Sequence, residues 1–459
     1  MKPATAQVKL TEIPFQVDLL DLHELCPERY PFVLESAVSQ APLGRYDILF
    51  AFPGESLCLD AERVVHAPAG YSSPGFLSCL DQWWSDIRQA AQNDLDLPFV
   101  GGWFVFLGYE LAQEIEPSLR LETRPGEPVA MATRVPVAVV RDRMRATAWI
   151  VAEPGYEAAT QIIEADIERL ESPAISVGAI LAERLSEEPP ERFIAAVETA
   201  KKHIADGDIF QANLSREWTG QLASQAGPAA VYRRLRISNP APFAGLAVYE
   251  DFAIISSSPE RLLRARAGRV ETRPIAGTRP RDASATDDEP GKTELLSHPK
   301  ERAEHVMLID LERNDLGRIC KAGSVKVDEF MVVESYSHVH HIVSNVGGQL
   351  LDDATPGAMI RAVFPGGSIT GCPKVRCMQI IHDLEAHPRG AYTGAMGYIN
   401  RDGSSDFNIL IRTITTSGRG LSFSTGSGIV ADSNPRQELE ETRAKAKGLL
   451  LALDSHCSE

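Results

Sequence analysis

The sequence predicts an α+β fold with antiparallel β-sheets. Strand-like runs follow one another through Gly-rich turns, instead of alternating one by one with helices as in a parallel α/β protein. Helical patterns form separate blocks between these runs. Hydrophobic residues make up 44% and charged residues 24% of 459 positions, which is ordinary for a globular protein. The length is sufficient for two domains or one very large one.

Residues 1–171 form a strand-rich N-terminal region. Its strands are expected in 43–52, 97–110 and 135–153, and its helices in 76–93 and 155–171. Residues 172–191 contain no clear strand and end in Glu-Glu-Pro-Pro, which indicates a linker.

Residues 192–459 are predicted to form the second region. The expected helices are 192–208, 299–315, 354–365, 374–385 and 435–453, and the strands lie within 243–260, 268–278, 330–350 and 392–430. The last helix has the clearest start signal, because Asn434 can act as its N-cap and Pro435 suits its first position.

Charge and cysteine content exclude several classes of protein. The net charge of −17 argues against a nucleic-acid or anionic-membrane partner, so any anion site must gather its Lys and Arg locally. Seven cysteines without a CxxC pair indicate reduced thiols in a cytoplasmic protein. We see no signal peptide, and no apolar run of about 18 residues that would span a membrane.

Two predicted helices each carry a pair of glutamates three residues apart. Glu301 and Glu304 share one helical face, and Glu438 and Glu441 share another, with Lys445 on the same face as the latter. Four facing carboxylates need a cation between them, and oxygen ligands without a His/Cys cluster favour Mg²⁺. The alternative is that both pairs are ordinary solvated helix faces.

Glycine- and hydroxyl-rich segments could bring backbone N–H groups to an anion. They are 274–278, 364–371, 392–398 and 424–428, and none matches a nucleotide fingerprint. Tight sheet turns are the simpler explanation for each.

Single polar residues inside apolar strands are the other candidates. Arg412 stands among Ile and Leu and needs an anionic partner if it is buried. Gln211, Glu260 and His341 have similar settings, although structural ion pairs or a hydrogen-bonded core histidine would explain them equally well.

Nine motifs follow one another along the second region: GDIFQANLS, SSSPERLL, PIAGTRPR, KERAEHVMLIDLERNDLGR, YSHVHHIVS, FPGGSITGCPKVRCMQII, GAMGYI, IRT and GSGIVADSNP. Together they resemble the chorismate-utilising enzymes, a family that includes anthranilate, aminodeoxychorismate, isochorismate and salicylate synthases. The resemblance covers about 192–453 in order and is looser in the N-terminal region. It implies two facing antiparallel sheets wrapped by helices, with intertwined halves.

The resemblance implies a role for each candidate residue. Glu304 and Glu441 would bind Mg²⁺, with Glu301 and Glu438 beside them, and the metal would hold the C1 carboxylate of chorismate. Glu260 would be the general acid that protonates the departing C4 hydroxyl. The enolpyruvyl carboxylate would be held, or the pocket completed, by Arg412, Tyr392, Lys445 and the N–H groups near Gly426 and Gly428; His341 and Thr278 would lie near the ring.

Gln211 indicates which nucleophile is used. Water-using members of the family place a lysine base there, whereas a glutamine cannot deprotonate water but can orient ammonia. We therefore expect an enzyme that uses ammonia. Since the sequence shows no glutaminase segment, a separate glutamine amidotransferase subunit would supply that ammonia.

Two ammonia-using branches remain. FPGGSITG, NPAPF and the short length favour the aminodeoxychorismate branch, which feeds 4-aminobenzoate and folate synthesis. Ala276 favours the anthranilate branch of tryptophan synthesis, since many aminodeoxychorismate synthases have a lysine there. An alternative from another functional class is a non-catalytic relative that binds chorismate or tryptophan. The presence of Glu260, Glu304 and Glu441 argues against it.

A tryptophan pocket is also implied by the resemblance. PFVLES, with Ser36, and NPAPF, with Asn239, Pro240 and Phe243, match the segments that form it in the family. The alternative is that both segments are plain packing strands.

Overall fold

The computed structural model describes residues 8–37, 44–90, 96–170, 178–280, 299–335 and 339–454. At 276, 278–280, 299–301, 335 and 339 it describes the backbone only. Within this part of the chain, no helix has both the length and the apolar character needed to cross a membrane.

The first sheet has 12 strands, and each paired neighbour runs antiparallel. Its order is β1-β9-β8-β3-β2-β12-β13-β22-β23-β11-β10, with β19 beside β11. The strands are β1 (Lys9–Ile13), β2 (Phe32–Glu35), β3 (Tyr46–Ala51), β8 (Val137–Asp142), β9 (Thr147–Ala152), β10 (Ser186–Glu187), β11 (Gln211–Gln221), β12 (Phe243–Tyr249), β13 (Phe252–Ser258), β19 (Gly371–Cys372), β22 (Thr413–Ser417) and β23 (Gly420–Ile429).

The second sheet has 11 strands and is likewise antiparallel. Its order is β16-β18-β15-β14-β21-β20-β6-β7-β4-β5, with β17 beside β18. The strands are β4 (Ser56–Leu59), β5 (Val65–His66), β6 (Gly102–Leu107), β7 (Ala130–Val135), β14 (Arg261–Arg266), β15 (Arg269–Arg273), β16 (Ile275–Pro280), β17 (Lys326–Ser335), β18 (Val339–Gln349), β20 (Ala395–Asn400) and β21 (Ser405–Ile409).

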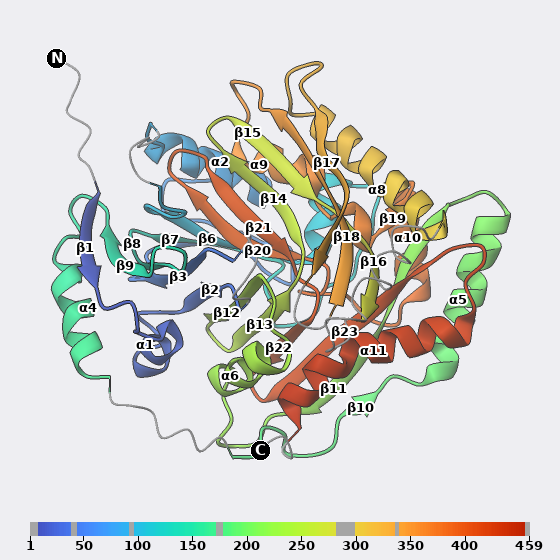
Figure 1. Ribbon diagram of the computed structural model, residues 1–459, viewed down its shortest axis with the longest axis horizontal. Helices are drawn as coiled ribbons and strands as arrows, with labels where there is room; N and C mark the ends of the chain where they lie inside the picture. Colours follow the sequence, from blue (N-terminus) through green and yellow to red (C-terminus); the bar gives the residue numbers. More distant parts are fainter. Residues whose placement is uncertain are drawn as a thin grey trace.

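Helices surround both sheets (Figure 1). They are α1 (Leu19–Leu25), α2 (Phe76–Ile87), α3 (Ala112–Ile115), α4 (Ala159–Glu168), α5 (Pro190–Ala205), α6 (Pro228–Ser238), α8 (Pro299–Gly317), α9 (Pro356–Val363), α10 (Lys374–Leu384) and α11 (Pro435–Leu453), with 3₁₀ turns at Tyr109–Leu111 and Gly367–Ile369.

Both sheets combine strands from the two ends of the chain. In the first sheet, β2 pairs with β12, which places Glu35 opposite Ala244. In the second, β6 pairs with β20, and Phe104 lies opposite Tyr398. The expected fold of two antiparallel sheets with intertwined halves is therefore confirmed.

Three layers of apolar packing hold the sheets and helices together. The inner faces of the two sheets meet in an aromatic core, where the rings of Phe32 and Phe104 stack with centroids 4.1 Å apart. The outer face of the second sheet packs against α2, α8 and α9, and that of the first against α1, α4, α6 and α11. A fourth cluster packs α5 and α10 against Ala212, Leu214 and Ile429, on the face of β11 and β23 opposite to Gln211 and Asn213.

Several element boundaries differ from the sequence expectation. The described part of the linker adds the edge strand β10, and Leu181 bridges to Leu222, because unpaired backbone groups at a sheet edge gain partners there. Helix α5 begins at Pro190, two residues earlier than expected, and α2 ends at Ile87 instead of 93. The short helices α1 and α6 were not predicted.

Candidate active site

The floor of the site is one face of the paired strands β11 and β23. Asn213 lies opposite Gly428, and Ser215 opposite Gly426. Side chains alternate between the faces of a strand, so Gln211 and Asn213 project on the same side as the two glycines. The signal for this pairing was present in the sequence only as two separate motifs.

The two glycines let neighbouring groups approach this floor closely. A Cβ atom on Gly428 would lie 2.7 Å from Nε2 of Gln211 and 3.4 Å from Oε1 of Glu304. A Cβ atom on Gly426 would lie 2.7 Å from the hydroxyl of Tyr392. Any side chain at either position would therefore collide with groups that already lie against the strands.

Helix α8 contributes Glu304 to the site. The Nε2 group of Gln211 donates a hydrogen bond of 2.8 Å to Oε1 of Glu304. This bond fixes the orientation of the glutamine amide, because a carboxylate can accept but cannot donate. The side chain of Glu301, one turn earlier, lies outside the described residues.

Helix α11 brings Glu441 and Lys445 next to Gly426 of β23. Nζ of Lys445 donates to the carbonyl of Gly426 at 2.9 Å and lies 2.7 Å from Oε1 of Glu441. Glu438 faces elsewhere: its buried carboxylate accepts a hydrogen bond from Ser427, whose side chain points to the other face of β23. Glu438 therefore does not lie with Glu441 and Lys445.

The carboxylates that remain at the site fit a hard cation. Among the described residues, no group of three or more His, Cys, Asp or Glu is placed to hold a metal ion. Mg²⁺ does not need such a group, since it commonly takes one or two protein carboxylates and completes its shell with water and substrate oxygens. The carboxylates of Glu304 and Glu441 carry oxygen donors of the kind that Mg²⁺ takes, with Glu441 paired to Lys445 in this structure.

Arg412 supplies positive charge to the pocket. Its backbone has a φ of 53°, a left-handed conformation that is uncommon for a residue with a side chain. Its guanidinium has no hydrogen bond or ion pair with the described residues, and burial lowers its pKa, against the charge of Glu441. An arginine that is only partly exposed, and that has no protein partner among the described residues, can pair with an anionic group.

His341 and Tyr392 lie near Arg412. Burial, reinforced by the charge of Arg412, lowers the pKa of His341 to about 4, so the imidazole is neutral at pH 7. Burial raises the pKa of Tyr392, whose hydroxyl therefore remains a donor. The pocket thus holds two cations, Arg412 and Lys445, beside two neutral polar groups.

Glu260 has the properties of a general acid. It is 5% exposed, and burial raises its pKa to about 7, opposed by a hydrogen bond from Ser368 and by the charge of Lys445. The hydroxyl of Ser368 donates to Oε1 of Glu260 at 2.7 Å. A carboxyl group with this pKa can both hold and release a proton near neutral pH.

A buried ion pair that the sequence did not indicate joins the walls of the pocket. Arg389, 3% exposed, forms two hydrogen bonds with Glu385, of 2.8 and 2.7 Å. Its other N–H groups donate to the carbonyls of Asn213 and Ile369 and to the hydroxyl of Thr393. One guanidinium thereby fixes β11, the turn that carries Ser368 and the residue that follows Tyr392.

Glu110 fastens the same loop from the N-terminal region. Its carboxylate accepts hydrogen bonds from the backbone N–H groups of Arg389 and Gly390, at 2.8 and 3.1 Å. Burial raises the pKa of Glu110 to about 7. Residues 106–110, with the sequence FLGYE, therefore contact the candidate site through the loop before Tyr392.

Two further candidates are described only in part. The backbones of Ala276 and Thr278 lie in β16, opposite Ile342 and His341 of β18. Their side chains lie outside the described residues. The backbone register alone places Thr278 next to His341.

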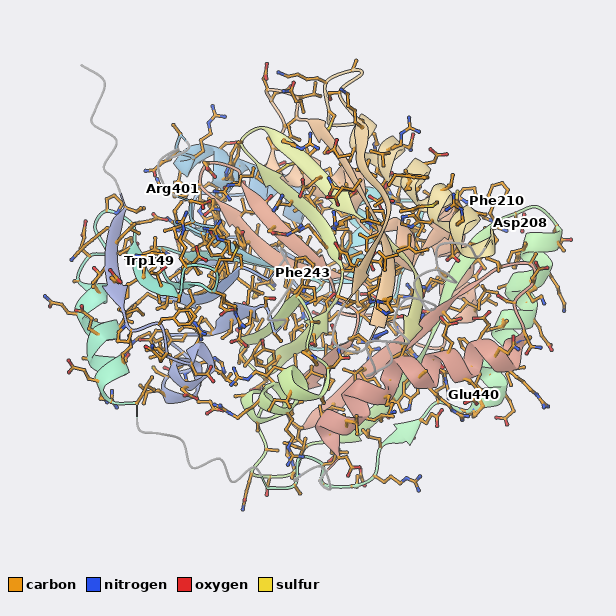
Figure 2. All side chains as sticks on the ribbon, in the orientation of Figure 1. Trp149, Asp208, Phe210, Phe243, Arg401 and Glu440 are labelled. Carbon is orange, nitrogen blue, oxygen red and sulfur yellow. The ribbon has the colours of Figure 1, made fainter. Side chains whose placement is uncertain are left out.

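A second cavity, of about 340 Å³, lies between the two sheets. Phe243 lines it and is seen near the middle of the molecule (Figure 2), and Glu35 lines it from β2. Its walls come from β2, β3, β12, β14, β20 and β21 and from neighbouring loops. Asn239 and Pro240 do not line it; the amide of Asn239 donates to the carbonyl of Ser257 instead.

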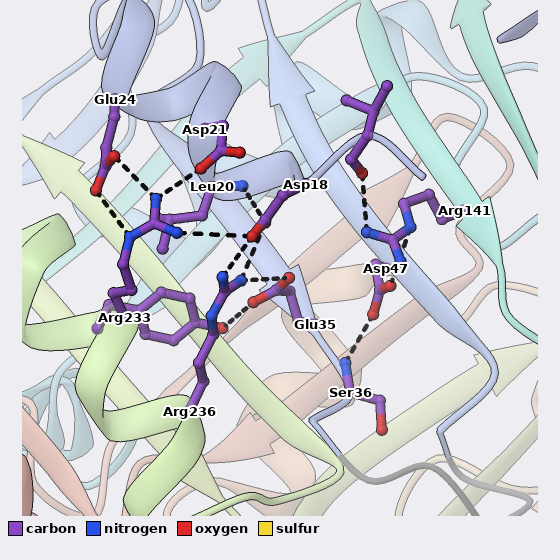
Figure 3. A network of polar contacts seen from close by, with 12 residues as sticks. Asp18, Leu20, Asp21, Glu24, Glu35, Ser36, Asp47, Arg141, Arg233 and Arg236 are labelled. Atoms are coloured by element: carbon purple, nitrogen blue, oxygen red, sulfur yellow. Dashed lines mark hydrogen bonds and ion pairs between the residues drawn. The ribbon is translucent and has the colours of Figure 1, made fainter. Parts of the chain in front are cut away.

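Glu35 and Ser36 belong to a network of charged residues beside this cavity (Figure 3). The backbone N–H of Ser36 donates to Asp47 at 3.0 Å, while the serine hydroxyl points away from Asp47. Tyr232 donates to Glu35 at 2.8 Å, and Arg236 lies 3.5 Å from its other oxygen. Burial, with the charge of Asp47, raises the pKa of Glu35.

Comparison with known proteins identifies the family. The profile of the chorismate binding enzyme family matches residues 52–451. The chain is 40% identical to aminodeoxychorismate synthase component 1 of Bacillus subtilis, covering 96% of both chains. It is 37% identical to anthranilate synthase component 1 of Synechocystis, covering 94% of this chain and 92% of that one.

A solved structure agrees with this result. The crystal structure of anthranilate synthase component I from Streptococcus pneumoniae superposes with a TM-score of 0.77 at 32% identity, over 89% of this chain and 93% of that one.

Proposed function

This chain belongs to the chorismate-binding enzyme family, and we propose that it aminates chorismate with ammonia to give 4-amino-4-deoxychorismate. The observation that carries the choice of nucleophile is Gln211, whose amide is hydrogen-bonded to Glu304 beside Gly428. An amide cannot remove a proton from water, whereas ammonia needs no deprotonation before it attacks. A nitrogen nucleophile therefore suits this position.

The pocket charges suit a dianionic substrate. Arg412 has no protein carboxylate as a partner among the described residues and would bind one carboxylate of chorismate. Glu304 and Glu441 would hold Mg²⁺, whose charge would neutralise the other carboxylate. These local charges offset the net charge of −17 on the chain as a whole.

Glu260 would supply the proton for the leaving group. Hydroxide leaves poorly, but a C4 hydroxyl that receives the proton of Glu260 leaves as water. Ammonia forms the new C–N bond and then loses a proton, so the overall change is chorismate plus ammonia to the amine plus water. With a pKa of about 7, Glu260 is available as the acid at neutral pH.

The aminodeoxychorismate branch is supported by the FPGGSITG and NPAPF segments. Ala276 does not provide the lysine nucleophile found in many members of that branch. Lys445 is engaged as a donor by the carbonyl of Gly426 and by Glu441, so we propose direct attack by ammonia, without a lysine adduct. Anthranilate formation is the second candidate, supported by Ala276 and by relatives such as the Synechocystis protein.

Ammonia would come from a separate glutamine amidotransferase subunit. The relatives named above are called component 1 or component I, which is consistent with a second component. We place both subunits in the cytoplasm. Free ammonium at alkaline pH would replace the partner in vitro.

Product analysis tests the proposal. The purified chain is incubated with chorismate, Mg²⁺ and ammonium near pH 8.5, and the products are separated by chromatography with mass detection. A product that keeps the enolpyruvyl group, and that a lyase converts to 4-aminobenzoate, supports the proposal. Fluorescent anthranilate with stoichiometric pyruvate would instead establish the second candidate.

We also propose that the second cavity binds an amino acid such as tryptophan. Its volume of about 340 Å³ suits a small ligand. Phe243 and Tyr46 offer aromatic surface, while Glu35 and Arg264 offer charges for an amino and a carboxylate group. Calorimetric titration with tryptophan should show binding that Phe243→Ala weakens; no heat of binding would exclude this role.

A further inference from the structure

The floor of the active site contains two buried oxygens without a partner. Oε1 of Gln211 and Oδ1 of Asn213 are both inaccessible to solvent, and neither has a hydrogen-bond donor among the described residues. Leaving a buried acceptor unsatisfied costs about 1–3 kcal/mol. Such a cost at a functional site indicates that a ligand supplies the missing donor.

Both oxygens lie on the face of β11 that looks into the pocket. The amide of Gln211 is oriented by its bond to Glu304, which leaves Oε1 as the free end. Oδ1 of Asn213 lies 2.7 Å from the position that a Cβ atom on Gly426 would take, next to the hydroxyl of Tyr392. With no side chain at position 426, Oδ1 of Asn213 and the hydroxyl of Tyr392 both lie against this glycine.

The donors available from the proposed substrates are few. Chorismate carries two carboxylates and an ether oxygen, which only accept, and one hydroxyl that can donate. Ammonia carries three N–H donors and one lone pair. Two acceptors from neighbouring positions on one strand can bind two N–H groups and leave the lone pair free to attack.

We propose that Asn213 and Gln211 together form the ammonia subsite, with Asn213 as a second acceptor that orients the nucleophile. The inference rests on the proposed function, because it assigns an ammonia-dependent reaction to this pocket. Gln211 alone would leave ammonia free to rotate about one hydrogen bond. The second acceptor removes that freedom and points the lone pair away from the strand, towards the substrate.

The test is Asn213→Leu, which keeps the size of the side chain and removes the acceptor. Its matched control is Gln221→Leu, an amide on the same face of β11 but at the exposed far end of the strand. Steady-state rates are measured with ammonium chloride as the nitrogen source, and KM is calculated for free ammonia and for chorismate separately. Thermal melting and circular dichroism check that each variant is folded.

We expect Asn213→Leu to raise the KM for ammonia about five- to tenfold, the size of one hydrogen bond, with the KM for chorismate unchanged. Gln221→Leu should change neither. An unchanged KM for ammonia would overturn the proposal, and so would a rise confined to chorismate, which would mean that Asn213 binds the C4 hydroxyl. If the leucine variant does not fold, Asn213→Val, which is favoured in strands, is measured by the same criteria.

The wild-type protein separates failure of this inference from failure of the proposed function. If the wild type gives no aminated product from chorismate and ammonium, the proposed function fails and the subsite fails with it. If the wild type is active and Asn213→Leu has the wild-type KM for ammonia, only the subsite fails.

Discussion

Removing the hydroxyl of Ser368 should shift the pH dependence of the reaction to higher pH. The Ser368 hydroxyl donates to Oε1 of Glu260 at 2.7 Å and lowers the pKa of that carboxyl, which burial has raised to about 7. The bond stabilises the ionised form more than the acid form. In Ser368→Ala the ionised form loses this support, so the pKa of Glu260 rises further.

The size of the shift follows from the bond. A hydrogen bond to a charged group contributes about 1.5–3 kcal/mol, and 1.36 kcal/mol corresponds to one pKa unit. The lower end gives a rise of about one unit, from about 7 to about 8. Because the acid form is the active one, the rate falls as pH rises through this pKa, and the fall should begin about one pH unit later in the variant.

The assay is the pH profile of kcat/KM for chorismate at a constant concentration of free ammonia. Glu110 and Glu312 also have pKa values of about 7, so the position of the falling limb cannot by itself assign it to Glu260. A shift of this limb in Ser368→Ala does assign it to Glu260, since neither Glu110 nor Glu312 is hydrogen-bonded to Ser368. A limb that stays in place, or moves to lower pH, would refute Glu260 as the acid. Ser404→Ala, which removes a similar bond to a distant aspartate, is the control.

Three further outcomes follow from the same geometry. Glu304→Gln should abolish Mg²⁺-dependent turnover and leave the circular dichroism spectrum unchanged. Full activity of this variant at low Mg²⁺ would exclude Glu304 as a metal ligand. Glu385→Gln leaves its buried arginine partner uncompensated and should lower the free energy of unfolding in urea by about 3–5 kcal/mol, whereas Glu440→Gln, which breaks an exposed pair, should cost less than about 1 kcal/mol. Gly426→Ala puts a Cβ atom 2.6–2.7 Å from three atoms of the pocket and should abolish turnover, while Gly227→Ala, with open space around it, should not.

Elements with strong local signals could be predicted from the sequence. Helix α11 begins and ends where the pattern placed it, and Asn434 caps it by accepting from the N–H groups of Arg436 and Gln437. Such signals are local, since a cap and its helix lie within a few residues of each other. The short helix α6 escaped prediction because Val231, Tyr232 and Leu235 are buried by tertiary packing rather than by a long periodic pattern.

The candidate site could be predicted as a set of residues but not as an arrangement. The sequence pointed to Gln211, Glu304 and Gly428 separately, while their contact depends on pairing between β11 and β23, about 200 positions apart. The spacing of Glu438 and Glu441 indicated a shared helical face. The structure places Glu438 against Ser427 and Glu441 beside Lys445. Neighbouring groups, and not spacing alone, therefore determine where a carboxylate points.

The long-range polar contacts explain why the pocket needs both regions of the chain. Glu110 comes from the N-terminal region and binds the backbone of the loop that carries Tyr392, while Arg389 of that loop holds β11 through the carbonyl of Asn213. A change in the position of Glu110 is therefore transmitted through one buried guanidinium to the strand that bears both amide acceptors. Since a fully hydrogen-bonded arginine has little freedom to move, the spacing between Tyr392 and Asn213 is set by the fold before any substrate binds. The N-terminal region thus fixes distances within the candidate site.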